Sequence, residues 1–148
     1  MRRLFLIVIT AIIIPSMLWA DQTFMVIDDN MATLTITWES NSAGAAAVTT
    51  NASSTALMQG WWVTMAITNP RALPNPPDDN HSYTVKDQNG IDIFGGMLAS
   101  RDTLNSEPMI PCIGGSIYGP WPVTGALTVG VTGAGASNTG TIILLLAR

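Results

Sequence analysis

The sequence predicts an all-β domain: an antiparallel β-sandwich, Ig-like or jelly-roll-like, of about eight short strands. Runs of alternating or β-branched residues recur along the chain, and clusters of Gly, Pro, Asn and Ser separate them. After residue 20 no apolar i, i+3, i+4 spacing persists long enough to predict a helix. The 148 residues have room for one such domain, which we place at residues 21–148.

The apolar N-terminal segment, residues 1–20, has the order of a secretory signal peptide. Two arginines come first, a long apolar run follows, and Pro15 precedes a cleavage position after Ala20. The uncharged run is also long enough for a membrane anchor. A third alternative is a start codon placed too early, since Met25 and Met31 could each begin the domain.

The first half of the domain predicts four strands. These are residues 23–28, 32–39, 45–50 and 60–68. The second is the clearest, because Leu34, Ile36 and Trp38 alternate with threonines at the period of two that a half-buried strand requires. The stretch 40–44 predicts a turn, and residues 54–60 could form one helical turn at most.

The second half predicts further strands around a proline-rich loop. They are residues 82–87, 91–96, 116–123, 125–132 and 139–147. Residues 69–80 contain four prolines and predict a loop, since proline cannot donate to a β-ladder. Asn89 and Gly90 predict a hairpin turn between two strands. The prolines within 116–123 predict a sheet edge, and the glycine-rich loop 133–138 predicts the tip of the last hairpin.

The turn around Gly90 raises the question of a metal site. Asp87, Asn89 and Asp92 surround this glycine, but an EF-hand loop needs its glycine at position six and a glutamate at position twelve. Counted from Asp87, the glycine comes at position four and Leu98 stands where the glutamate belongs. We therefore expect a hairpin with a solvated tip and neither metal nor cofactor. A looser calcium site on the three oxygen-bearing side chains is the alternative.

Few residues could support catalysis or nucleic-acid binding. His81 is the sole histidine, and because no triad partner is placed beside it by sequence, we expect a surface histidine, no catalytic residue and no enzyme. Cys112 is the sole cysteine and is expected to be a small buried hydrophobe. The net charge is −4, so a basic surface for nucleic acid is lacking.

Apolar residues exceed what one buried face of a sandwich needs. Trp61 and Trp62 are neighbours in one strand and must point to opposite faces, and residues 142–146 are apolar on both faces. Exposed apolar surface marks an association site. The interface candidates are Trp61, Trp62, Trp121, Ile143 and Leu145. Alternatively, the proline-rich loop or residues 97–123 fold over the second face.

Residues 33–148 resemble small all-β proteins encoded in the structural modules of tailed bacteriophages and prophages. The matching motifs are Trp38, Ser40 and Gly44; Asn69 and Pro70; Tyr83, Val85, Gly90 and Asp92 with Gly95 and Gly96; and a final hairpin from Gly125 to Gly140. These are turn motifs, so they indicate a fold family more specifically than an activity.

The resemblance implies a virion structural protein of the capsid-associated or decoration type. Its partners would be capsid or other virion proteins and copies of itself, with a membrane as partner only if residues 1–20 are retained. An export signal does not suit such a protein, which leaves a later start, a virion containing a membrane, or a host gene that borrowed the domain. The alternative function is an exported bacterial binding or surface module in the periplasm or at the cell surface, whose loops 69–80 and 97–123 contact a ligand.

Overall fold

The computed structural model describes residues 22–70 and 75–148. The strands of a six-stranded sheet, here called the large sheet, are β1 (Gln22–Asp28), β2 (Met31–Glu39), β4 (Trp62–Pro70), β6 (Glu107–Met109), β9 (Trp121–Pro122) and β11 (Thr139–Ala147). The strands of a three-stranded sheet, the small sheet, are β3 (Ala46–Thr49), β5 (Ser82–Lys86) and β10 (Thr128–Thr132). The strands β7 (Cys112–Ile113) and β8 (Ile117–Tyr118) pair with each other in a short hairpin. The helix α1 (Ala52–Met58) joins β3 to β4.

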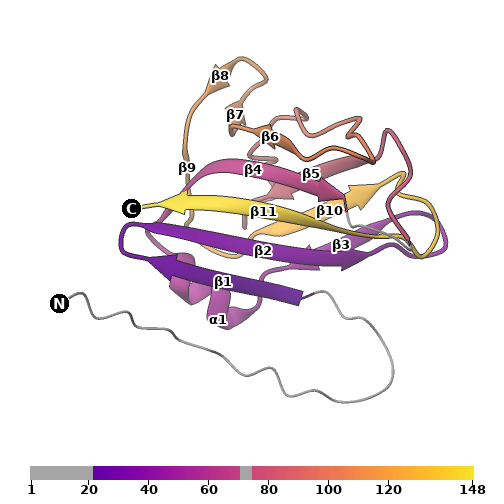
Figure 1. The fold of residues 1–148 in the computed structure, drawn as a ribbon. Coiled ribbons are helices and arrows are strands. Elements are labelled where there is room, and N and C mark those ends of the chain that lie inside the picture. Colours follow the sequence, from indigo (N-terminus) through magenta and orange to yellow (C-terminus); the bar gives the residue numbers. More distant parts are fainter. Residues whose placement is uncertain (1–21, 71–74) are drawn as a thin grey trace, which may run out of the picture.

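The two sheets pack face to face, with β2, β11 and β4 on one side and β3, β10 and β5 on the other (Figure 1). The large sheet has the order β1-β2-β11-β4-β6, with β9 also paired to β4, and the small sheet has the order β3-β10-β5. All the strand pairs are antiparallel. The predicted all-β sandwich is therefore confirmed.

The chain changes sheet at almost every connection. It runs from β2 in the large sheet to β3 in the small one, back to β4, across to β5, then to β6, β10 and β11 in alternate sheets. Residues 98–101 extend the small sheet beyond β5, because Tyr83 N donates to Leu98 O at 2.9 Å and Arg101 N donates to His81 O at 2.7 Å. This alternation is the strand order of a jelly roll, and it favours that one of the two predicted sandwich types.

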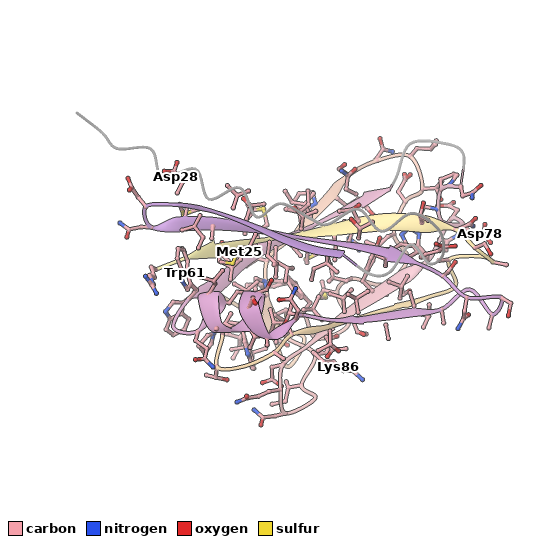
Figure 2. All side chains as sticks on the ribbon, turned by 90° about the horizontal axis from the view of Figure 1, so that it is seen from below. Met25, Asp28, Trp61, Asp78 and Lys86 are labelled. Carbon is pink, nitrogen blue, oxygen red and sulfur yellow. The ribbon has the colours of Figure 1, made fainter. Side chains whose placement is uncertain are left out.

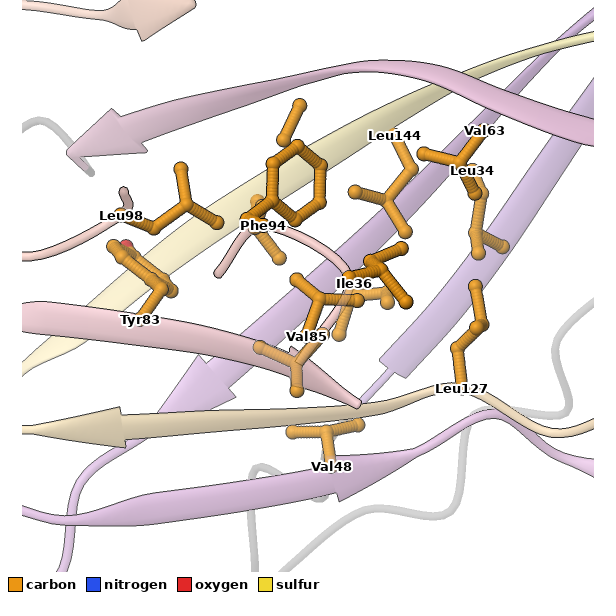
Figure 3. Close-up of a cluster of buried hydrophobic side chains, with 14 of the residues drawn as sticks. Leu34, Ile36, Val48, Val63, Tyr83, Val85, Phe94, Leu98, Leu127 and Leu144 are labelled. Atoms are coloured by element: carbon orange, nitrogen blue, oxygen red, sulfur yellow. The ribbon is translucent and has the colours of Figure 1, made fainter. Parts of the chain in front are cut away.

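The core lies between the sheets and is supplied by alternate residues of each strand. Leu34 and Ile36 of β2 are fully buried, as the period of two predicted, and β11 adds Leu144 beside Leu34. Figure 3 shows Val48 and Val85 of the small sheet facing these side chains. Burying each of these side chains contributes about 1.5–3 kcal/mol.

The helix α1 was not predicted at this length. Asn51 caps it, since its side chain accepts a hydrogen bond from Ser54 N at 2.8 Å, and Met58 in its last turn is fully buried. The prediction of one turn at most was wrong because a seven-residue helix is too short to show an apolar period. Its capping residue was the available signal.

Of two predicted hairpins, one is only partly formed and the other is not formed. After β5 the chain turns and Ile93 N donates to Val85 O at 2.8 Å, but residues 93–96 then form further turns instead of a strand. The strands β10 and β11 do not form a hairpin at all, because they belong to different sheets. The glycine-rich loop 133–138 crosses between the sheets. Glycine residues predicted a change of direction there, but they carry no information about which sheet follows.

The proline-rich segment was predicted as a loop from residue 69. The strand β4 continues to Pro70 at its end, and residues 75–80 form a loop, while 71–74 lie outside the described residues. Within the stretch 116–123, predicted to lie at a sheet edge, β9 pairs with β4 outside the main strand path, whereas β8 pairs with β7 in a separate hairpin. The predicted signal or anchor, residues 1–20, also lies outside the described residues. In the part that is described, no helix is long and apolar enough to cross a membrane.

Candidate association surface

The outer face of the large sheet is lined by apolar side chains and threonines. Cross-strand pairing places Thr35, Ile143 and Ile67 in one row and Thr33, Leu145 and Met65 in the next. These rows point away from the core because the alternate residues, such as Leu144, are buried. Across the described parts of β2, β4 and β11, the outward side chains of 31–37, 62–69 and 141–147 carry no charge.

Charged side chains lie instead toward the ends and the opposite side of the molecule. Figure 2 shows Asp28 and Asp78 at opposite ends and Lys86 on the side of the small sheet. Arg148 follows β11 directly and its main-chain N–H donates to Asn30 O at 3.0 Å, at the same end as Asp28. The middle of the large sheet is therefore an uncharged surface on an acidic protein.

Three of the five interface candidates lie on this face. Trp62 is 45% exposed, and Ile143 and Leu145 are half-buried in the middle of the sheet. Trp61 is not available to a partner, because it is only 2% exposed and the guanidinium of Arg148 lies 4.8 Å from its ring centroid. Selecting Trp61 was wrong, although the prediction that the two neighbouring indoles point to opposite faces is confirmed.

Trp121 has an intermediate role. It lies on β9, opposite Val63 of β4, and packs against the edge of the core. It is therefore half-buried and mainly closes the sandwich at this side. Beside it, Trp62 and Thr124 border a shallow uncharged hollow of about 470 Å³. The aromatic residue open to a partner at this edge is therefore Trp62.

A second apolar surface lies on the hairpin of β7 and β8 and was missed. This hairpin, residues 111–120, is called the arm and stands off the β6 edge of the large sheet in Figure 1. It exposes Ile113, Ile117 and Tyr118. A sequence signal was present, because no Asp, Glu, Lys, Arg or His occurs from Pro108 to Ala147.

The turn around Gly90 uses its carboxylates to bind main-chain N–H groups. Asp87 Oδ1 accepts from Asn89 N at 2.9 Å and from Ile91 N at 3.0 Å. Asp92 accepts from the main chain at Val85, Phe94 and Gly96, with distances of 3.2, 3.2 and 2.8 Å. Within the described ranges, no three His, Cys, Asp or Glu side chains converge as metal ligands would. The geometry therefore agrees with the predicted turn and gives no support to the looser calcium site.

His81 is buried, so the prediction of a surface histidine was wrong. Its ring is 1% exposed and packs against Tyr83 and Trp38, with centroid separations of 5.2 and 6.4 Å. Its Nδ1–H donates to Asp78 O at 2.8 Å. Burial lowers the pKa of the imidazole, because the charged form loses its hydration. Its position at the start of β5, where the chain enters the sandwich, explains the burial.

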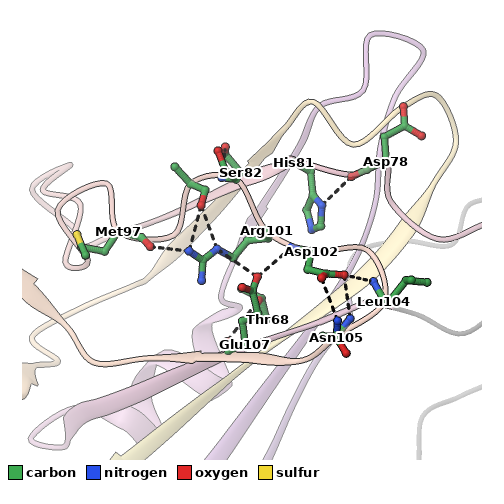
Figure 4. A network of polar contacts seen from close by, with 12 residues as sticks. Thr68, Asp78, His81, Ser82, Met97, Arg101, Asp102, Leu104, Asn105 and Glu107 are labelled. Atoms are coloured by element: carbon green, nitrogen blue, oxygen red, sulfur yellow. Dashed lines mark hydrogen bonds and ion pairs between the residues drawn. The ribbon is translucent and has the colours of Figure 1, made fainter.

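A polar network ties the segment after β5 to the large sheet (Figure 4). The guanidinium of Arg101 donates to Met97 O at 3.0 Å and lies 3.6 Å from the carboxylate of Glu107. That carboxylate accepts from Asp102 N at 2.9 Å. Hydrogen bonds from Asn105 and the adjacent main chain lower the pKa of the exposed Asp102 carboxyl. These side chains hold the loop in place.

No family model matches the chain, and neither a curated protein nor a solved structure matches it.

Proposed function

We propose that the protein is a non-enzymatic virion structural protein of the capsid-associated or decoration type. It acts by associating in many copies with capsid or other virion proteins and with itself. The observation that carries the proposal is the uncharged middle of the outer face of the large sheet, with Ile67, Ile143, Leu145, Met65 and Trp62 exposed or half-buried on it.

This face suits association for a physical reason. A sandwich needs one apolar face on each sheet, which faces the core, and the opposite face is ordinarily polar. An apolar outer face has no role within one molecule, and it gains free energy when a partner covers it. Because a lattice presents many copies together, each contact can be weak while the whole assembly remains stable.

The polar side chains support a structural role in place of a catalytic one. His81 is buried and bonded to the main chain, while Asp87 and Asp92 hold a turn. Each group that could transfer a proton or bind a metal in this region instead fixes a loop of the sandwich. The resemblance to phage structural proteins supports the same conclusion.

The test is to purify particles from a strain that carries the gene and to quantify this chain by mass spectrometry. We expect its peptides to co-purify with capsid proteins in many copies per particle. An Ile143→Asp variant should be lost from the particles, whereas Thr84→Asp, on the outer face of the small sheet, should be retained.

The proposal is overturned if the chain is absent from particles and is recovered from the periplasm or the cell surface. The N-terminal peptide in the same data separates the alternatives for residues 1–20. A chain starting at Asp21 indicates export, one starting at Met25 or Met31 indicates a later start, and one retaining Met1 indicates an anchor.

A further inference from the structure

The arm has two different faces. In its two-stranded ladder Cys112 pairs with Tyr118, and Ile113 pairs with Ile117. Successive residues of a strand point to opposite faces, so the two pairs lie on opposite sides of the arm. Cys112 is fully buried, which identifies the first side as the one that faces the body. The two isoleucines, 46% and 65% exposed, therefore form an outward apolar knob.

The body-facing side of the arm borders an apolar groove. This groove holds about 310 Å³ and is lined by Met65, Pro108, Met109, Ile110 and Tyr118. Its side chains come from the outer face of β4, from β6 with the residue that follows it, and from β8. Ile110 and Tyr118 are 45% and 54% exposed, so the groove is open to a partner.

The arm is held in position at its base. Cys112 N donates to Ile93 O of the body at 3.0 Å, and within the arm Gly119 N donates to Pro111 O at 3.0 Å. A Cβ atom on Gly95 would lie 2.8 Å from Cys112 O, so the main chain of the turn after β5 packs closely against the arm. A fixed arm loses little conformational entropy when a partner binds it.

We propose that the isoleucine knob of one copy docks into the apolar groove of a second copy of this chain. The knob and the groove lie on opposite sides of one arm, so they cannot meet within a molecule. Both are apolar, and neither contains a charged side chain. Two acidic molecules of net charge −4 repel each other over most of their surfaces, but not where uncharged surfaces meet.

This inference deepens the proposed function, on which it rests for the many copies present together. It names one contact of that assembly, in which a knob meets a different surface on its partner. A contact of this kind is heterologous and can extend from copy to copy in a ring or a row.

The experiment uses two variants of the purified full-length chain in sedimentation analysis. Ile117→Asp places a charge on the knob, and Ile110→Asp places one in the groove; both residues are substantially exposed, so folding should be retained and is checked by circular dichroism. We expect wild type to self-associate with rising concentration, and each variant to weaken that association at least tenfold. In a mixture, the Ile110→Asp chain supplies an intact knob and the Ile117→Asp chain supplies an intact groove. The two variants should therefore form a heterodimer. Leu104→Asp, at an 86% exposed site outside the arm and groove, should behave as wild type.

A cysteine pair detects the contact if it is weak. Ile117→Cys and Ile110→Cys chains, mixed and oxidised, should form a heterodimer linked between these positions, while Cys112 is buried and should not react. The proposal is overturned if wild type self-associates but the mixture of the two aspartate variants does not. It is also overturned if either aspartate variant by itself associates as tightly as wild type. It is equally overturned if wild type is monomeric at about 0.5 mM and no cross-link forms. A dissociation constant of that size corresponds to a binding free energy of about 4–5 kcal/mol. The particle experiment is independent, because a chain that enters virions without this contact leaves the proposed function intact.

Discussion

The outer faces of the two sheets differ, although their inner faces share one core. On the large sheet the outward side chains of β4 and β11 include Met65, Ile67, Ile143 and Leu145. On the small sheet the outward positions are filled by short or polar residues. They are Ala47, Thr49, Ser82, Thr84, Lys86, Thr128, Gly130 and Thr132.

The difference separates what folding requires from what association requires. Both sheets supply buried residues to the core, such as Leu144 from one and Val129 from the other. Only the large sheet carries a second apolar face. Folding does not account for that excess, because the small sheet folds without it. The comparison therefore points to the large sheet as the side that a partner covers.

The largest effect is expected from a charge placed on each outer face in turn. Ile143→Asp should weaken particle binding or self-association by roughly 100-fold or more, since an unpaired charge buried at an interface costs about 3–5 kcal/mol. Thr84→Asp should change the association constant by less than threefold. Sedimentation or particle-binding titration measures both. Equal losses for the two variants would contradict the distinction between the faces.

A matched pair of glycines compares the packing of the two sheets. A Cβ atom on Gly140 of β11 would overlap the indole of Trp38, whereas one on Gly130 of β10 would meet the hydroxyl of Thr84 at 2.8 Å. Gly140→Ala should lower the free energy of unfolding by about 1–3 kcal/mol through overpacking.

Gly130→Ala should change the free energy of unfolding by less than about 0.5 kcal/mol. The threonine hydroxyl can rotate away, and removing a strand glycine recovers part of any loss. Denaturant unfolding of both variants gives the comparison. A larger loss for Gly130→Ala would show that the small sheet is the more tightly packed one.

The pH dependence of stability tests the contact that joins the sheets through His81. Its ring packs against Trp38 of the large sheet and Tyr83 of the small one. Burial, the largest influence, lowers its pKa below 6.5; Asp79 and Glu107 oppose this and Arg101 adds to it. The unfolded chain then binds more protons, so stability is full above about pH 6.5 and falls as the pH drops toward the folded pKa.

Thermal melts between pH 8 and pH 5 measure this loss, whose slope is at most about 1.4 kcal/mol per pH unit. His81→Asn should remove the part of the slope below pH 6.5 that this residue causes. If the substitution leaves the slope unchanged, other groups account for it and His81 does not couple pH to the joining of the sheets.

The smallest effect concerns the polar face of the small sheet. Thr49 Oγ1 and Thr128 Oγ1 lie 3.0 Å apart across the ladder of β3 and β10. A double-mutant cycle with valine at both positions should give a coupling of about 0.2–1 kcal/mol. A coupling near zero would mean that solvent replaces this hydrogen bond at no cost, and that the face is polar for solubility alone.

Much of the fold could be predicted because most strands have a clear local pattern. The alternation of Leu34, Ile36 and Trp38 determined both the strand and its buried face. The pairing of strands could not be predicted, since Gly133 and Gly135 permit a crossover as readily as a hairpin. The burial of His81 also depends on long-range contacts, because Trp38 lies far from it in sequence.

The candidate surface was predicted in part. The central residues Ile143 and Leu145 could be predicted because residues 142–146 are apolar on both faces of the strand. Because Trp61 and Trp62 are adjacent, the sequence also indicated that only one of them could be exposed. Which of the two is outside depends on the register of β4 with β11, where a shift occurs between Leu145 and Leu146. The arm was missed because its strands are two residues each, too short for any pattern.

The position of β11 has a consequence for the order of events during biosynthesis. This strand lies between β2 and β4, yet it is the last of the described strands to leave the ribosome. Until residue 147 has been translated, no strand lies between the two halves of the large sheet. The edges of β2 and β4 that pair with β11 then remain without a partner strand. Assembly of this sheet must therefore wait until β11 has been synthesised, so a chaperone that shields β2 and β4 in the nascent chain should raise the yield of native protein.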